Sequence, residues 1–151
     1  PPGERDWDRF RALFAPGACL MPSRRTERGI VLERYDPDGY AASRGPIFRQ
    51  TAFYEREVGR RLAISGDIAH AWSSYEGRFG LEGPPALNGV NSIQLHRDRS
   101  GWRIVSLLWD TGRSGPLQRR RGQPSLMPLT FDEAIVGREV DVERLAHHHQ
   151  S

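Results

Sequence analysis

Three segments between Asp67 and Asp110 alternate apolar and polar residues. They are DIAHAWSSYEGRF, NSIQLHR and WRIVSLLWD. A period of two residues is typical of β-strands that bury one face. The connection GLEGPPALNG is rich in glycine and proline, and RDRSG has the composition of a tight hairpin turn. The pattern therefore predicts three consecutive antiparallel strands of a strongly curved sheet.

The segments before these strands alternate between helical and strand patterns. In DWDRFRALF the apolar residues recur at helical spacing, and Asp6 is placed to cap this short helix. ACLM and GIVLERY predict a strand pair around the polar turn SRRTERG, and YDPDGY predicts a further turn. Over residues 48–64, the spacing of Tyr54, Val58 and Leu62 by four predicts a second helix.

The sequence changes in character after Asp110. TGRSGPLQRRRGQPSLMP has no apolar period and predicts a linker, whereas FDEAIVGREVDVERLAHHH has apolar residues near helical spacing. We therefore expect one α+β domain over residues 1–110 and a partly irregular C-terminal extension over residues 111–151.

Composition narrows the class of protein. A chain of 151 residues with 37% hydrophobic content fits one domain with a core, and no apolar run is long enough to cross a membrane. The net charge of +3 is small, so we do not expect nucleic-acid binding. The single Cys19 excludes an internal disulfide, which agrees with the cytoplasmic location that we expect. We expect no cofactor and no metal, because no zinc-protease or phosphate-loop spacing occurs.

The order of elements resembles the nuclear-transport-factor-2-like superfamily, which includes ketosteroid isomerases and small SnoaL-like polyketide cyclases. The resemblance rests on FRALFAPGACL, TAFYEREVGRRL, GDIAHAWSSYEGR and GVNSIQLHRDRSGWRIVSLLWD, over roughly residues 7–110. It implies a cystatin-like α+β cone, in which a curved antiparallel sheet packs on helices and encloses a pocket. The superfamily usually opens with a further helix, so we expect a segment before Pro1.

The resemblance also implies where isomerase chemistry would lie. In the isomerases a carboxylate base follows the first strand, and a Tyr and a protonated acid hold the enolate oxygen. The alignment of FAPGACLMP places Pro22 at the base position, and Asn91 at that of the oxyanion acid. The oxyanion Tyr would come from the missing helix. Proline cannot act as a base, so we expect steroid isomerase activity to be absent.

Strand phase selects the candidate pocket residues. His70 alternates with Trp72 and Glu76 on one face of its strand, and we expect this face to line the cavity together with Tyr54 and Asn91. A strand histidine between apolar neighbours is either a hydrogen-bonded core residue or a general base, for which Glu76, Tyr54 or Glu55 would be partners. Asp110, at the mouth end of the last strand, is either a second acid/base group or a turn residue.

Three functions follow from these expectations. The first is a small-molecule-binding domain whose mostly apolar pocket takes a small apolar or aromatic ligand, with catalysis left open. The second is an isomerase, dehydratase or cyclase that uses His70 or Asp110 as acid/base. The third is an interaction module that acts through its sheet, favoured if aromatic side chains and leucines fill the cavity. Because the last strand is apolar on both faces, we also expect a homodimer.

Overall fold

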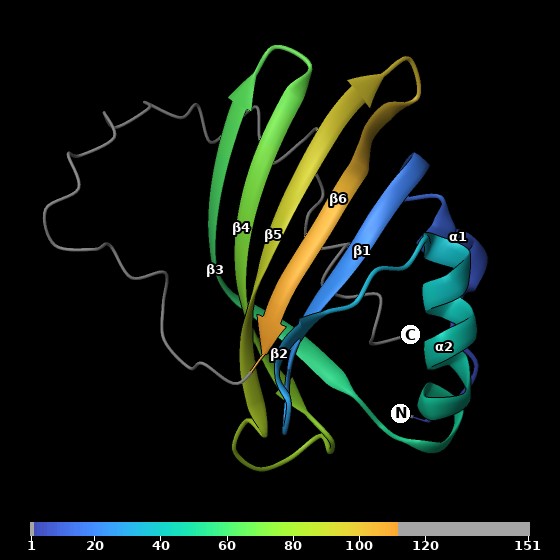
Figure 1. Ribbon diagram of the computed structural model, residues 1–151, viewed down its shortest axis with the longest axis vertical. Helices are drawn as coiled ribbons and strands as arrows, with labels where there is room; N and C mark the ends of the chain where they lie inside the picture. The colour runs from blue at the N-terminus through green and yellow to red at the C-terminus, as the bar shows by residue number, and fades with distance from the viewer. Residues whose placement is uncertain (1, 112–151) are drawn as a thin grey trace, which may run out of the picture.

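The structure, a computed structural model, describes residues 2–111 (Figure 1). Its elements, in chain order, are α1 (Trp7–Arg11), β1 (Phe14–Thr26), β2 (Gly29–Leu32), α2 (Pro37–Gln50), β3 (Tyr54–Ser65), β4 (Ile68–Arg78), β5 (Leu87–Asp98) and β6 (Gly101–Thr111). The predicted linker after Thr111 and the segment with near-helical apolar spacing, residues 131–149, lie outside the described residues. So does nearly all of the expected extension.

The six strands form one curved sheet in the order β2-β1-β6-β5-β4-β3. Neighbouring strands are antiparallel except β1 and β6, which are parallel. The prediction of three consecutive antiparallel strands, β4 to β6, is therefore confirmed. A strand pair β1–β2 is also present, but its paired residues 23–26 and 29–32 include most of SRRTERG, which was expected to be the turn. Figure 1 shows both helices gathered on one side of the curved sheet. The expected α+β fold class is confirmed.

The first helix and its cap match the sequence pattern closely. The carboxylate of Asp6 accepts a hydrogen bond from the backbone N–H of Arg9 at 2.9 Å, as expected of an N-cap. The helix ends at Arg11, earlier than predicted, and Phe14 already begins β1. From the start of β1 the Phe14 ring packs against the Phe10 ring, with centroids 4.9 Å apart. Helix and strand therefore share one apolar cluster.

The second helix was predicted in the wrong place. YDPDGY does not form only a turn, because Asp36 caps α2 and Pro37 opens it. Residues 54–64 belong to β3 and not to a helix. Positions four apart share a face in a strand as well as in a helix, so the spacing of Tyr54, Val58 and Leu62 could not separate the two. Gly66, at φ +59°, forms the turn from β3 into β4.

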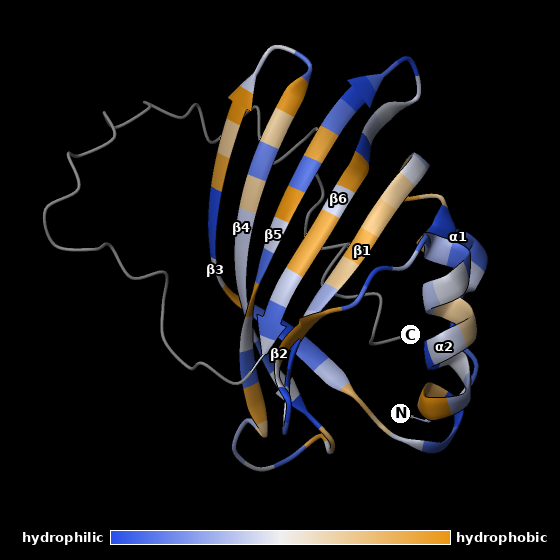
Figure 2. Cartoon of the chain, viewed as in Figure 1, coloured by the Kyte–Doolittle hydropathy of each residue, from blue (hydrophilic) through white to orange (hydrophobic). Residues whose placement is uncertain are grey.

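The core lies between the helices and the concave face of the sheet. Leu20, Ala71, Ile93 and Ile104 are each at most 3% exposed, and the rings of Trp7 and Phe10 pack against this cluster. The alternation of apolar and polar residues along the strands that produces this burial is visible in Figure 2. Burying a leucine or isoleucine side chain stabilises a fold by about 1.5–3 kcal/mol. Leu20, Ile93 and Ile104, together with Trp7 and Phe10, also line a cavity.

The convex face of the sheet carries exposed apolar side chains. Ile68, Trp72, Val105 and Leu108 are between 37% and 61% exposed. The expectation that a second subunit covers this face stays a prediction. Within residues 2–111, neither helix has the length and apolar character needed to span a bilayer.

Candidate functional site

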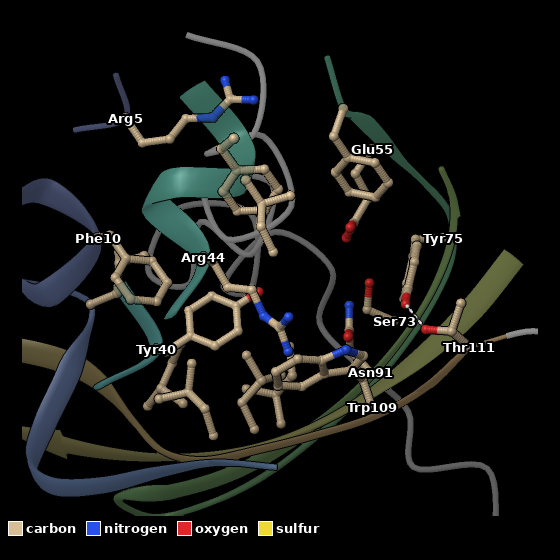
Figure 3. Close-up of a pocket in the computed structure, with 18 of the residues that line it drawn as sticks. Arg5, Phe10, Tyr40, Arg44, Glu55, Ser73, Tyr75, Asn91, Trp109 and Thr111 are labelled. Atoms are coloured by element: carbon tan, nitrogen blue, oxygen red, sulfur yellow. Dashed lines mark hydrogen bonds between the residues drawn. The ribbon is translucent and has the colours of Figure 1, made fainter. Parts of the chain in front are cut away.

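A cavity of about 290 Å³ lies between the two helices and the concave face of the sheet. Aromatic and aliphatic side chains form most of its wall, among them Trp7, Phe10, Phe48 and Trp109. A small set of polar groups, shown in Figure 3, interrupts this apolar surface. Apolar walls with a few placed polar groups are typical of small-molecule sites.

Glu55 is the acidic group most strongly affected by the cavity. It is the second residue of β3 and 8% exposed, and its carboxyl points into the cavity (Figure 3). Burial disfavours the charged form and raises the pKa of Glu55 from its ordinary value of 4.5 to about 8, against the effect of a hydrogen bond from the Asn91 side chain, which lowers it. At neutral pH this carboxyl is therefore mostly protonated.

Strand pairing places Glu55 opposite Gly77 of β4. A Cβ atom at Gly77 would come within 2.5 Å of Leu87 and 3.0 Å of Phe53. The missing side chain lets those two residues pack beside Glu55 and close that part of the wall.

Tyr75 supplies a neutral hydroxyl on the same side of the cavity. Its Oη lies 3.1 Å from Oγ1 of Thr111, and burial raises the pKa of the Tyr75 phenol. Gly89 pairs with Tyr75 across β4 and β5, and a Cβ at Gly89 would overlap the tyrosine ring. Ser73, which also lines the cavity, donates a hydrogen bond to Oε2 of Glu57. This side of the cavity thus presents uncharged hydrogen-bonding groups.

Guanidinium groups also line the cavity. Arg24 and Arg44 both pair with Oε2 of Glu33, at 3.3 and 3.4 Å. The Arg44 guanidinium also lies 5.8 Å from the ring centroid of Tyr40, within cation–π range. Burial raises the pKa of Tyr40 to about 12, so its hydroxyl stays neutral. Arg5, the third cation of the wall, is 7% exposed.

No family model and no curated protein matches this sequence. Solved structures do. A nuclear-transport-factor-2-like protein with a cystatin-like fold from Novosphingobium aromaticivorans superposes with a TM-score of 0.58 at 15% identity, over 76% of this chain and 77% of that one. A cystatin-like protein of unknown function from Nostoc punctiforme gives 0.56 at 14%, over 75% and 81%. A candidate dehydratase of the nuclear-transport-factor-2-like family from Streptomyces avermitilis gives 0.51 at 14%, over 72% and 84%.

The protein has the nuclear-transport-factor-2-like fold. The resemblance in the sequence is thus confirmed at the level of the fold. This fold carries many unrelated activities, so its function has to be argued from the cavity.

Of the residues predicted to line the pocket of this nuclear-transport-factor-2-like fold, only Asn91 does so. His70 and Trp72 lie on the convex face of β4, where their ring centroids are 5.0 Å apart. The Nε2 atom of His70 lies 2.9 Å from Oγ of Ser92. Glu76, on the same face, forms ion pairs with Arg56 and Arg78. The expected phase of β4 is therefore wrong by one residue.

The curvature of the sheet explains the reversed phase. The residues of β4 that face the helices are Ala69, Ala71, Ser73 and Tyr75, each at most 7% exposed. Ala69 and Ala71 face the packed core, where small side chains fit between converging neighbours, whereas the large Tyr75 faces the open cavity. The larger side chains were expected on the inner face, and a one-residue slip moves every side chain to the other face.

The remaining candidates also lie outside the cavity wall. Tyr54 pairs with Arg78 at the edge of the sheet, and Asp110, an exposed residue of β6, pairs with Val90 and Ser23. Pro22, at the expected base position, is buried beside Trp109 but does not line the cavity. Within residues 2–111, no three His, Cys, Asp or Glu side chains gather closely enough to hold a metal ion.

Glu55 was underestimated from the sequence. It was considered only as a partner for His70, because YEREVGRRL was interpreted as a helix. The correct signal was available in that segment. As a strand, it alternates Glu55 and Glu57 with Arg56, and a carboxylate placed on the inner face of a cone must be either paired or protonated.

Proposed function

We propose that this protein binds a small, mostly apolar or aromatic molecule in the cavity between its helices and the concave face of its sheet. The observation that carries this proposal is the open volume of about 290 Å³ in the position where a protein acting only through its surface would pack side chains. Hydrogen-bonding groups of Glu55, Tyr75 and Asn91 converge on that volume and would orient the ligand.

Filling the cavity should abolish binding of a neutral apolar probe. Leu107 lines the cavity, whereas its neighbour Leu108 is exposed on the convex face. We expect Leu107→Trp to reduce the affinity for N-phenyl-1-naphthylamine by at least about tenfold, because the indole would occupy the volume that the probe needs. Leu108→Trp adds the same atoms outside the cavity and should leave the affinity unchanged.

The measurement is the fluorescence of the probe, with circular dichroism to establish that both variants fold. Equal loss of affinity in the two variants would show that the probe does not bind in the cavity. Absence of binding by the unaltered protein would remove the support for the proposal.

A second candidate function is proton transfer by Glu55. The observation that favours it is a carboxyl with a pKa of about 8 inside an apolar cavity, next to the amide of Asn91. A protonated carboxyl is a general acid, and neutral donors beside it would stabilise a developing oxyanion. Such a site suits loss of water from a β-hydroxy carbonyl compound. The ionised form of Glu55 would remove the proton from the α-carbon, and the protonated form would give it to the β-hydroxyl, which leaves as water. Glu55 then takes the role that the sequence analysis gave to His70 or Asp110.

Glu55→Gln should separate binding from chemistry. On a panel of β-hydroxy ketones and esters, followed by the absorbance of the α,β-unsaturated product, we expect this variant to lower kcat by at least about 100-fold. It should still bind N-phenyl-1-naphthylamine. His70→Gln, outside the cavity, is the control and should keep full activity. Turnover that survives in Glu55→Gln but disappears in His70→Gln would contradict this assignment.

A further inference from the structure

We propose that the ligand of this cavity carries a carboxylate and that the guanidinium of Arg5 binds it. This inference rests on the proposed binding function and adds the chemical class of the ligand. Its basis is the hydrogen-bonding state of Arg5, the local charge and the arrangement of polar groups across the cavity.

Arg5 is a buried cation with an open hydrogen-bonding edge. The residue is 7% exposed and lines the cavity, and its Nε and Nη2 atoms are both buried without a hydrogen-bond acceptor among the described residues. Arginine does not deprotonate in proteins, so its charge stays in place. Burying a charge without hydrogen bonds is unfavourable, which makes a ligand the expected source of the missing acceptor.

The two open nitrogen atoms are the ones that recognise a carboxylate. Nε and Nη2 lie on the same edge of the guanidinium plane, and their N–H groups point in parallel. A carboxylate places two oxygen atoms at the matching separation and accepts both hydrogen bonds at once. Phe48, whose ring centroid lies 5.3 Å from the guanidinium carbon of Arg5, favours the cation but supplies no acceptor for that edge.

The surrounding charges leave Arg5 without compensation in the described part of the wall. Arg24 and Arg44, which also line the cavity, share the single carboxylate of Glu33, so these groups of the wall carry a net positive charge. The Asp6 carboxylate accepts a hydrogen bond from the backbone of α1 and forms no ion pair with Arg5 among the described residues. The Glu55 carboxyl is mostly protonated at neutral pH because of its raised pKa. The cavity therefore favours an anion near Arg5.

The position of Arg5 also indicates the rest of the ligand. Figure 3 shows Arg5 on the helical side of the cavity and Glu55, Ser73 and Asn91 on the side of the sheet. Aromatic side chains lie between these two groups. A ligand that satisfies both would have a carboxylate at one end, an aromatic or aliphatic body, and a neutral hydrogen-bonding group at the other.

A matched set of naphthalene compounds tests this inference by isothermal titration calorimetry. We expect 2-naphthoate to bind at least about tenfold more tightly than the neutral 2-naphthamide, the size expected when hydrogen bonds to a charged group are lost. Arg5→Met should remove this difference by weakening naphthoate alone. Arg9→Gln, which changes an exposed arginine of α1, is the control and should preserve it.

The thermal stability of the unliganded protein checks the Arg5→Met variant. Methionine fills a similar volume without a charge, so the variant should melt at the same temperature as the parent protein or above it. A lower melting temperature would show that Arg5 supports the fold itself and would overturn the inference.

Equal affinities for naphthoate and naphthamide would refute the carboxylate anchor while leaving the proposed binding function intact. Equal affinities for 2-naphthoate and 2-naphthalenesulfonate would refute the preference for a two-oxygen anion. If neither naphthalene compound nor N-phenyl-1-naphthylamine binds, the binding function itself fails.

Discussion

Replacing Glu55 with glutamine should make the protein progressively more stable than its parent as the pH rises from about 4.5 to about 8. The folded-state pKa of Glu55 is raised, so the folded protein favours the protonated form. The protonated Glu55 carboxyl makes its full contribution to the stability of the folded protein below pH 4.5. This contribution is lost as the pH rises through about 8. A shift of this size corresponds to roughly 3–5 kcal/mol of unfolding free energy, and glutamine has no carboxyl to ionise.

The measurement is urea unfolding of both proteins at several pH values between 4 and 9. Glu76→Gln serves as the control, because it removes a carboxylate from the convex face, where Glu76 is paired with Arg56 and Arg78. The control should not become more stable than the parent protein as the pH rises. If the free-energy difference between Glu55→Gln and the parent stays constant with pH, Glu55 is not held protonated in the cavity.

Gly89→Ala should destabilise the protein by about 1–3 kcal/mol, the usual cost of overpacking a filled site. The added Cβ would overlap the ring of Tyr75, which faces Gly89 across the strand pair. Tyr75 would have to move toward the cavity and away from Thr111, its hydrogen-bonding partner. The same change should therefore weaken the binding of N-phenyl-1-naphthylamine.

Gly59→Ala is the matched control, because Gly59 is also a strand glycine but has Ser74 as its nearest neighbour, 3.9 Å from the added Cβ. A change of at most about 0.5 kcal/mol is expected there. Chemical denaturation of both variants checks the comparison. If Gly89→Ala is as stable as Gly59→Ala, the close approach of Tyr75 to the backbone of β5 is not a constraint on the fold.

The fold could be predicted largely from patterns that are specific to one kind of element. The alternation in WRIVSLLWD and the hairpin at RDRSG allow no helical alternative, and Asp6 has the position and chemistry of a helix cap. The segment from Tyr54 to Ser65 is different, because its apolar spacing of four fits both a strand and a helix. Only its pairing with β4, the next strand of the same hairpin, decides the matter.

The site was less predictable because it depends on which face of each strand is inside. Asn91 was placed correctly, but His70 and Trp72 were assigned to the concave face, where the curvature of the sheet leaves room for Ala69 and Ala71. Glu55 and Arg5 contribute to the cavity only through burial, and burial arises from packing between segments far apart in the sequence. The alternation along β3 indicates that Glu55 could face inward, but a single sequence contains no direct signal for the open guanidinium edge of Arg5.

The central claim, that the cone cavity is the binding site, is tested most directly by mapping methyl chemical shifts during titration with N-phenyl-1-naphthylamine. Ile93, Ile104 and Leu107 line the cavity, whereas Ile68, Val105 and Leu108 are exposed on the sheet. We expect large, saturable shifts for the first group and none beyond the noise for the second. Shifts confined to Ile68, Val105 and Leu108 would show that the apolar convex face binds the probe, and would contradict the account.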